Sequence, residues 1–258
     1  MTALRHIFVV AHNTYREAVR EKLLYNLLIF AGLMIASSIV LAKIHIGYDE
    51  RIYYDVGLGA IALFGALIAI FVGINLVYRE ISQKTVYTML AKPVHRWEFL
   101  LGKYAGLLAL LALEVGVMSA CFLAVLRWQG VELGGDLGWA IGLIFVELAL
   151  VTAVAIFFST FTTPYLAGMF TVAIWIAGHL LADVRAFGQH SEVAGIQTLT
   201  EVIYWALPNF DRLDLKAAVG TGQPIELARV AAAAGYATLN IIALLLASVL
   251  LFRRRDFS

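Results

Sequence analysis

Two carboxyl groups, Glu114 and Glu147, lie inside long apolar stretches of the chain. An ionised carboxylate is costly to hold in an apolar interior, so we expect at least one of the two to carry a proton. A proton held there can be passed on, which favours a proton relay or a polar patch in a substrate path. The alternative interpretation is that both groups only hydrogen-bond neighbouring helices together.

The spacing of the two carboxyls predicts that they meet. At about 1.5 Å per residue, Glu114 lies about 17 Å from the N-terminal end of its stretch, and Glu147 about 12 Å from the N-terminal end of its own. On adjacent antiparallel helices in an apolar layer ~30 Å thick, these depths nearly coincide. We therefore expect a hydrogen bond between the two carboxyls, or from one of them to a hydroxyl such as that of Thr152.

Other chemistry is sparse in the sequence. The nucleotide-binding pattern GxxxxGK[ST] is missing, as are the hydrolase patterns HExxH and GxSxG. Cys121 is the single cysteine, and His179 is the single histidine within an apolar stretch. We expect a chain that is not an enzyme, binds no metal or cofactor of its own, and has no nucleic-acid partner.

The elements that must position these groups are membrane-spanning helices. Hydrophobic residues make up 62% of the chain, against roughly 45–50% in soluble domains. Six stretches approach the ~20 apolar residues that cross a bilayer as helix, and none alternates as barrel strands do. We predict an all-α polytopic membrane protein, with residues 1–258 forming a single transmembrane domain. The predicted spans are Leu24 to Ile44, Val56 to Tyr78, Tyr104 to Leu126, Trp139 to Phe161, Tyr165 to Ala182 and Val230 to Phe252.

The distribution of charge predicts the orientation. With six spans both chain ends share one side, and the connecting segments on that side hold 12 of the 19 Lys and Arg residues. The positive-inside rule places this side in the cytoplasm of a plasma or inner membrane. The exterior then receives a long acidic segment, Asp183 to Arg229.

The N-terminal segment, Met1 to Leu23, predicts an amphipathic helix. Apolar residues recur at three- and four-residue spacing, and charged residues such as Arg16 and Glu17 occupy the other face. Such a helix beside a span tends to lie in the lipid headgroup layer, although an ordinary solvated helix has the same pattern.

A stripe of small residues marks the second span. Gly65, Ala69 and Gly73 repeat every four residues, which allows a neighbouring helix to approach closely. That neighbour is a span of the same chain or of a second copy.

A polar hairpin, Arg79 to Lys103, joins the second and third spans on the cytoplasmic side. The second helix can continue to Leu90, with Glu80 and Lys84 as a pair four residues apart. Pro93 ends it, and a new helix can begin by Arg96. We predict a short braced elbow, a shape suited to transmitting a push.

The hairpin resembles that of the permease subunits of type-2 ABC exporters. The resemblance rests on a run of Glu, Thr, Met-Leu-x-x-Pro-Val, Arg, Glu and Gly-Lys, and on the closing Phe252, basic residues and Asp256. The hairpin residues that carry it are Glu80, Lys84, Thr85, Met89, Leu90, Pro93, Arg96, Glu98, Gly102 and Lys103.

The resemblance implies that two permease chains form a path between them, each docked on a separate cytoplasmic ABC ATPase that holds ATP and Mg. The hairpin would be the coupling helix, with Glu80, Lys84 to Arg96 and Glu98 near the partner. It also implies a re-entrant or interfacial helix before the last span, for which Ile196 to Leu207 is the candidate. An external accessory protein is a further expected partner.

Two other functions fit the residues. A proton-coupled secondary transporter would use Glu114 and Glu147 and need no ATPase. A membrane scaffold or assembly factor would use its spans only to anchor a partner. The apolar spans favour an amphipathic or lipid-like cargo, or a mechanical role on an external partner.

Overall fold

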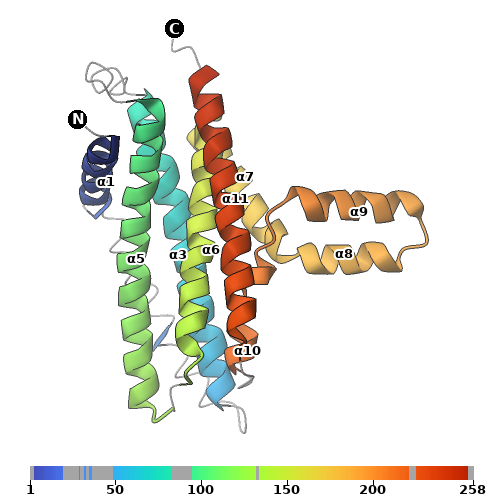
Figure 1. The fold of residues 1–258 in the computed structure, drawn as a ribbon. Helices are drawn as coiled ribbons and strands as arrows, with labels where there is room; N and C mark the ends of the chain where they lie inside the picture. Colours follow the sequence, from blue (N-terminus) through green and yellow to red (C-terminus); the bar gives the residue numbers. More distant parts are fainter. Residues whose placement is uncertain are drawn as a thin grey trace.

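Long apolar helices form the body of the protein. The computed structural model describes residues 3–19, 29, 32, 35–36, 49–82, 95–131, 134–220 and 225–254, and no strand occurs among them (Figure 1). The predicted first span, Leu24 to Ile44, and residues 83–94 of the hairpin lie outside the described residues, apart from four positions of that span.

Within the described part of the chain, four single helices are long and apolar enough to cross a membrane, and a bent pair makes a fifth candidate. They run side by side, and each is long enough to cross a hydrocarbon core ~30 Å thick. The four helices are α3 (Asp49–Ser82), α5 (Arg96–Trp128), α6 (Leu137–Ser159) and α11 (Leu227–Arg254).

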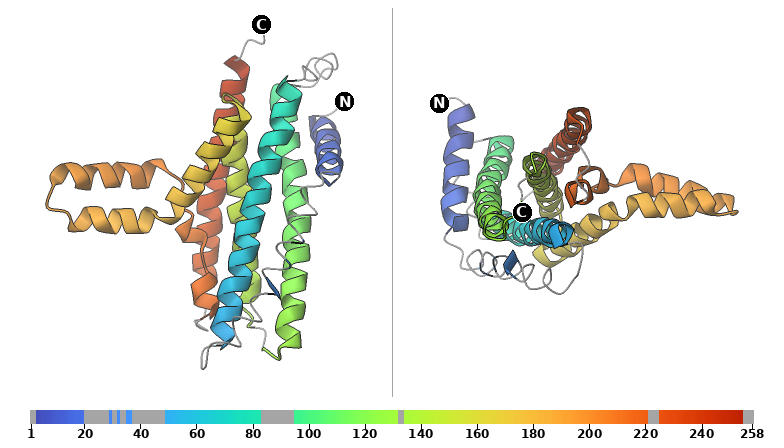
Figure 2. Two further views of the ribbon diagram at one scale, coloured as in Figure 1. Left: turned by 180° about the vertical axis from the view of Figure 1, so that it is seen from behind. Right: turned by 90° about the horizontal axis from the view of Figure 1, so that it is seen from below.

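Chain direction places the predicted elbow at one end of the bundle. The end of α3 and the start of α5 lie at the same end as α1 (Ala3–Val19) and the last turn of α11 (Figure 1). In the view along the bundle, α1 is seen from its side whereas the long helices are seen nearly end-on (Figure 2). The N-terminal helix therefore lies beside the bundle and runs across the direction of the long helices. Its position in a headgroup layer stays a prediction.

The predicted fifth span is bent. Helix α7 (Pro164–His179) begins with a proline in its first turn and ends three residues earlier than expected. Helix α8 (Leu181–His190) follows at 57° to it, with Leu180 between them. Residues distant in the sequence meet at this bend: Phe210 packs on Gly178, and its backbone N–H donates to the Gly178 carbonyl over 3.1 Å. Hydropathy along the sequence does not record such a contact, so it could not place the bend.

The predicted external segment is largely helical. Helices α8 and α9 (Ala194–Ala206) pack on each other as a hairpin that projects sideways from the bundle (Figures 1 and 2). Gly188 allows the close approach of Thr200 between them. Helix α9 ends just before Pro208, close to the expected limit at Leu207. A 3-10 turn, η1 (Asp211–Leu213), and the short α10 (Lys216–Gly220) lead back toward α11.

Helix α6 forms the centre of the core. It is apolar on every side and buried along most of its length, as expected for a helix surrounded by others. The small stripe of α3 packs against it: Gly65 faces Leu148, and Gly73 faces Ala155. This stripe therefore contacts a span of the same chain, and Ala69 between them is also buried.

A second small stripe brings α1 onto α5. A side chain at Gly102 would collide with Val10, and one at Gly106 would lie 2.6 Å from the Ala11 carbonyl oxygen. Among the described helices, α1 and α5 make the most extensive contact. The backbone of α1 thus lies almost directly on α5.

We expect Gly106→Val to loosen α1 from α5, because the added side chain collides with the α1 backbone and with Thr14. Overpacking of this kind costs about 1–3 kcal/mol. The midpoint of unfolding in detergent and the hydrogen exchange of α1 amides measure the effect. Gly116→Val, on the same helix, is the control, since no described atom lies within 4 Å of the added Cβ. Equal losses in both variants would contradict the close contact.

Candidate functional site

The first candidate site is the α1–α5 junction, where α1 lies across the start of α5. His6 Nδ1 lies 2.9 Å from Glu98 Oε2, and the same oxygen accepts the His95 backbone N–H over 3.1 Å. Glu98 occupies the third position of α5, where a carboxylate can turn back onto the preceding backbone. Its side chain is only 3% exposed.

A second ion pair closes the junction one helical turn further along. Lys103 is 1% exposed, and its Nζ lies 3.7 Å from Glu17 Oε2 and 5.9 Å from the centre of the Phe99 ring. A buried ammonium group is tolerated when an anion compensates its charge. The two pairs hold α1 near both of its ends, and therefore oppose sliding and rotation of α1 on α5.

The predicted ATPase contacts fall into two groups. Lys84, Thr85, Met89, Leu90 and Pro93 lie outside the described residues. Glu80 is in the last turns of α3, and Arg96 is the first residue of α5. Glu98 turns inward and contacts His6 of α1, because its position in the first turn of α5 favours a contact with the preceding backbone. Its expected contact with a partner stays a prediction.

The second candidate site is an intramembrane polar cluster around Glu147. The Trp175 indole N–H donates to Glu147 Oε1 over 3.0 Å, and His179 Nε2 lies 3.2 Å from the same oxygen. His179 Nδ1 lies 2.9 Å from the Trp175 carbonyl oxygen. Because a carbonyl oxygen only accepts, His179 Nδ1 donates to it, and Nε2 faces the Glu147 carboxyl.

The polar cluster lies where α7 bends into α8. Phe210 stacks on the His179 ring at 5.6 Å with an interplanar angle of 10°. A cavity of about 310 Å³ opens beside His179, with Trp175, Lys216 and apolar residues of α3 and α7 in its wall. The polar cluster is therefore next to a cavity and to the base of the α8–α9 hairpin.

Glu114 is fully buried, and neither of its carboxyl oxygens has a hydrogen-bond partner among the described residues. The expected hydrogen bond between Glu114 and Glu147 is not formed. Glu147 faces α7, and the Thr152 hydroxyl donates to the Leu148 carbonyl of its own helix. A carboxyl with no compensating charge in an apolar interior holds its proton.

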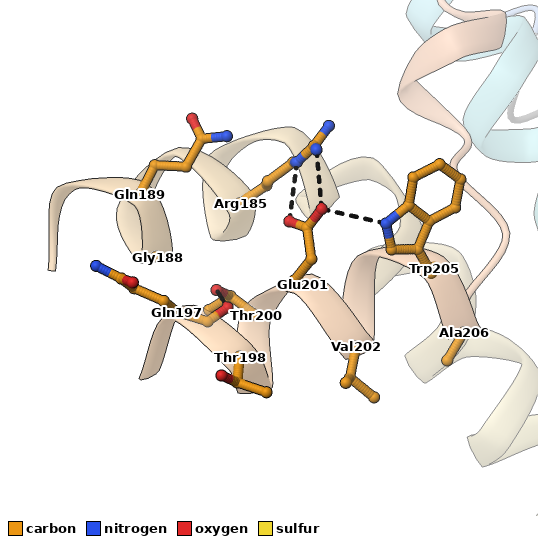
Figure 3. A pocket seen from close by; sticks show the side chains of 10 residues that line it. All are labelled: Arg185, Gly188, Gln189, Gln197, Thr198, Thr200, Glu201, Val202, Trp205 and Ala206. Atoms are coloured by element: carbon orange, nitrogen blue, oxygen red, sulfur yellow. Dashed lines mark hydrogen bonds and ion pairs between the residues drawn. The ribbon is translucent and has the colours of Figure 1, made fainter. Parts of the chain in front are cut away.

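The third candidate site is on the α8–α9 hairpin (Figure 3). Arg185 donates twice to Glu201, over 3.2 and 2.9 Å, and the Trp205 indole donates to the same carboxylate over 3.2 Å. The guanidinium lies 4.4 Å from the centre of the Tyr204 ring. Arg185, Glu201 and Trp205 are among the residues that line an open cavity of about 850 Å³.

Neighbouring guanidinium groups shift the pKa values of Glu201 and Tyr204 on this hairpin. The Arg185 guanidinium, helped by the Trp205 indole, lowers the pKa of Glu201. A hydrogen bond from the Arg212 guanidinium lowers the pKa of Tyr204. The shift at Glu201 favours the charged carboxylate, and with it the Arg185–Glu201 pair, near neutral pH.

Several of these residues were not predicted from the sequence. Trp175 and His179 are four residues apart on one helix face, a spacing that places both beside a single acceptor. Gly102 and Gly106 repeat the spacing of the small stripe that was identified on α3. The partners Arg185 and Glu201 are 16 residues apart, and only the turn between α8 and α9 brings them together.

The bundle of apolar helices with paired polar groups inside it defines a multi-pass membrane protein. Residues 9–257 match a family model described as ABC-2 family transporter protein. The chain belongs to this family, whose members are membrane components of transporters. A search of curated proteins found no match.

We expect Glu147→Leu to lower the stability of the bundle, because it leaves the Trp175 indole and His179 without their shared acceptor. Orphaning a fully buried polar group costs about 1–3 kcal/mol, and we expect less for each of these two half-buried groups. Glu147→Gln should lose less, since its amide oxygen still accepts. The midpoint of detergent-induced unfolding measures both.

Glu114→Leu is the matched comparison, and we expect it to be neutral or stabilising, because no described partner loses a bond. A loss as large as that of Glu147→Leu would contradict the assignment of Glu114 as an uncompensated acid.

We expect the α8–α9 hairpin to loosen as the pH falls. The pKa of Glu201 is lower in the folded protein than in the unfolded chain. Its contribution to stability is therefore fully present above the ordinary glutamate pKa and is lost as the pH falls through the lowered pKa of the folded protein. Glu201→Gln should remove this pH dependence and speed amide exchange in α9 by no more than about fivefold. Exchange measured at matched pH tests this, with Glu192→Gln, exposed on the same hairpin, as control.

Proposed function

We propose that this chain is the permease subunit of an ATP-driven export complex. A separate cytoplasmic ABC ATPase would hold ATP and Mg and supply the energy, and two permease chains would form the translocation path. The observation that carries the proposal is the α1–α5 junction, in a chain that belongs to a family of transporter membrane components.

The geometry suits transmission of force. Helix α3 has 34 residues and α5 has 33, so each is about 50 Å long and exceeds a hydrocarbon core ~30 Å thick. Ser82 and Arg96 end and begin these helices at one end of the bundle. A displacement of the residues between them would therefore move two continuous helices, stiffened by α1.

The α8–α9 hairpin is suited to contact a second permease copy or an external accessory protein. It projects from the bundle and touches it mainly through the α7–α8 bend. Its outer surface carries large apolar side chains, which in a membrane complex are normally covered. These are Phe187, Val193, Leu199, Val202 and Trp205.

The proposed location is the plasma or inner membrane, with both chain ends in the cytoplasm. The support is the excess of Lys and Arg in the segments at the α1 end of the bundle. In this orientation the α1–α5 junction faces the cytoplasm, where an ATPase would be found.

The polar cluster favours a second candidate function, a proton-coupled secondary transporter. Glu147 and His179 lie 3.2 Å apart beside a cavity, and Glu114 is a buried acid without a described hydrogen-bond partner. Such a transporter would work without an ATPase. The lack of a described hydrogen-bond path between Glu114 and Glu147 makes this the weaker candidate.

Copurification tests the proposed function. We expect the wild-type chain, isolated from its native membranes, to retain a protein that hydrolyses ATP. Arg96→Glu should remove it by reversing charge at the start of α5, without touching the inward-facing Glu98. Arg127→Glu, an exposed cation at the other end of α5, is the control and should retain the ATPase.

Transport by the purified chain alone in proteoliposomes would contradict an ATP-driven permease. If that transport depended on pH and were lost in Glu147→Gln, the secondary transporter would replace it. Retention of the ATPase without any effect on transport would indicate a scaffold.

A further inference from the structure

Helix α1 presents an uncovered face opposite its contact with α5. Val10, Thr14 and Ala18 are buried on the α5 side. The exposed side holds three apolar and four polar residues, and no described element covers them. They are Leu4, Phe8, Val9, Arg5, His12, Asn13 and Arg16.

Two of the exposed apolar residues, Leu4 and Phe8, form a strip, and Val9 lies on the other side of the arginines. Leu4 is 78% exposed and Phe8 is 71% exposed, values that favour an apolar environment outside the protein. At about 100° per residue on a helix, the two lie about 40° apart around the axis. Leu4 and Phe8 can therefore enter an apolar layer together.

The exposed cations lie beside this strip. Arg5 and Arg16, with His12 between them, fall within a sector of about 40°. The one acidic residue of α1, Glu17, is turned toward Lys103. Among the described residues, the exposed face of α1 therefore carries positive charge and no carboxylate.

The orientation of α1 matches a membrane surface. It lies across the bundle end, whereas the long helices run along the bundle (Figure 2). A helix in this plane with an apolar strip and flanking cations fits a layer of acidic headgroups above acyl chains. Each cation near such a surface strengthens binding substantially.

We propose that α1 binds anionic phospholipid headgroups through Arg5 and Arg16, with Leu4 and Phe8 among the acyl chains. The Glu17–Lys103 and His6–Glu98 pairs tie this helix to the start of α5, so the charge of the lipid surface acts on the start of α5. The α1–α5 junction thereby becomes a site where lipid composition influences the bundle. This inference goes beyond the proposed function and does not need an ATPase.

Hydrogen exchange of the full chain in lipid nanodiscs tests the inference. Exchange of α1 amides is compared in phosphatidylcholine alone and in phosphatidylcholine mixed with phosphatidylglycerol. We expect slower exchange in the anionic discs, by about fivefold for each arginine engaged. Arg5→Gln with Arg16→Gln should remove the difference, and both side chains are exposed, so the fold is retained.

The control is Arg51→Gln with Arg127→Gln, which removes two exposed cations at the opposite end of the bundle and should keep the lipid effect on α1. Glu17→Gln with His6→Ala tests the connection by removing both pairs: α1 should still respond to the lipid, and the response of residues 97–103 of α5 should be smaller than in the wild type. Equal exchange in both lipids overturns the proposal. So does a lipid effect that survives Arg5→Gln with Arg16→Gln, or a response of α5 that is undiminished in Glu17→Gln with His6→Ala.

Discussion

A charge inside an apolar bundle needs a compensating partner, and this constraint organises the described structure. Lys103 has Glu17, Glu98 has His6 and a backbone N–H, and Glu147 has Trp175 and His179. Each pairing joins two different helices or a helix to its own cap. The positions of buried charge therefore decide which helices move together, because separating a pair would leave a charge uncompensated.

These pairings divide the molecule into two working regions. At one end, α1, the start of α5 and the end of α3 form a stiff unit next to the predicted ATPase contact. At the α7–α8 bend, the Glu147 cluster and Phe210 hold the base of the hairpin. Helix α6, buried between them, connects both regions through close contacts with Gly65 and Gly73 of α3. Motion at the junction can therefore reach the hairpin through packed helices rather than through flexible loops.

Glycine and charge act together at the α1–α5 junction. Gly102 and Gly106 allow the backbones to approach, and this approach brings His6 to Glu98 and Glu17 to Lys103. A wider separation would leave Lys103 in an apolar environment without its anion. Glu98, Gly102 and Lys103, which resemble the family's Glu and Gly-Lys pattern, thus have a structural role: they hold the N-terminal helix against α5.

The sequence by itself determined the membrane class, the approximate positions of the long apolar helices after the first predicted span, the helical N-terminal segment and the family resemblance. These follow from hydrophobic length and periodicity, which are local properties. The tertiary structure decided the partners of the buried charges: Glu147 pairs with His179 rather than Glu114, and Glu98 pairs with His6. It also decided the bend after His179 and the pairing of Arg185 with Glu201. Such contacts depend on how helices rotate and cross, and no local pattern in one sequence records that geometry.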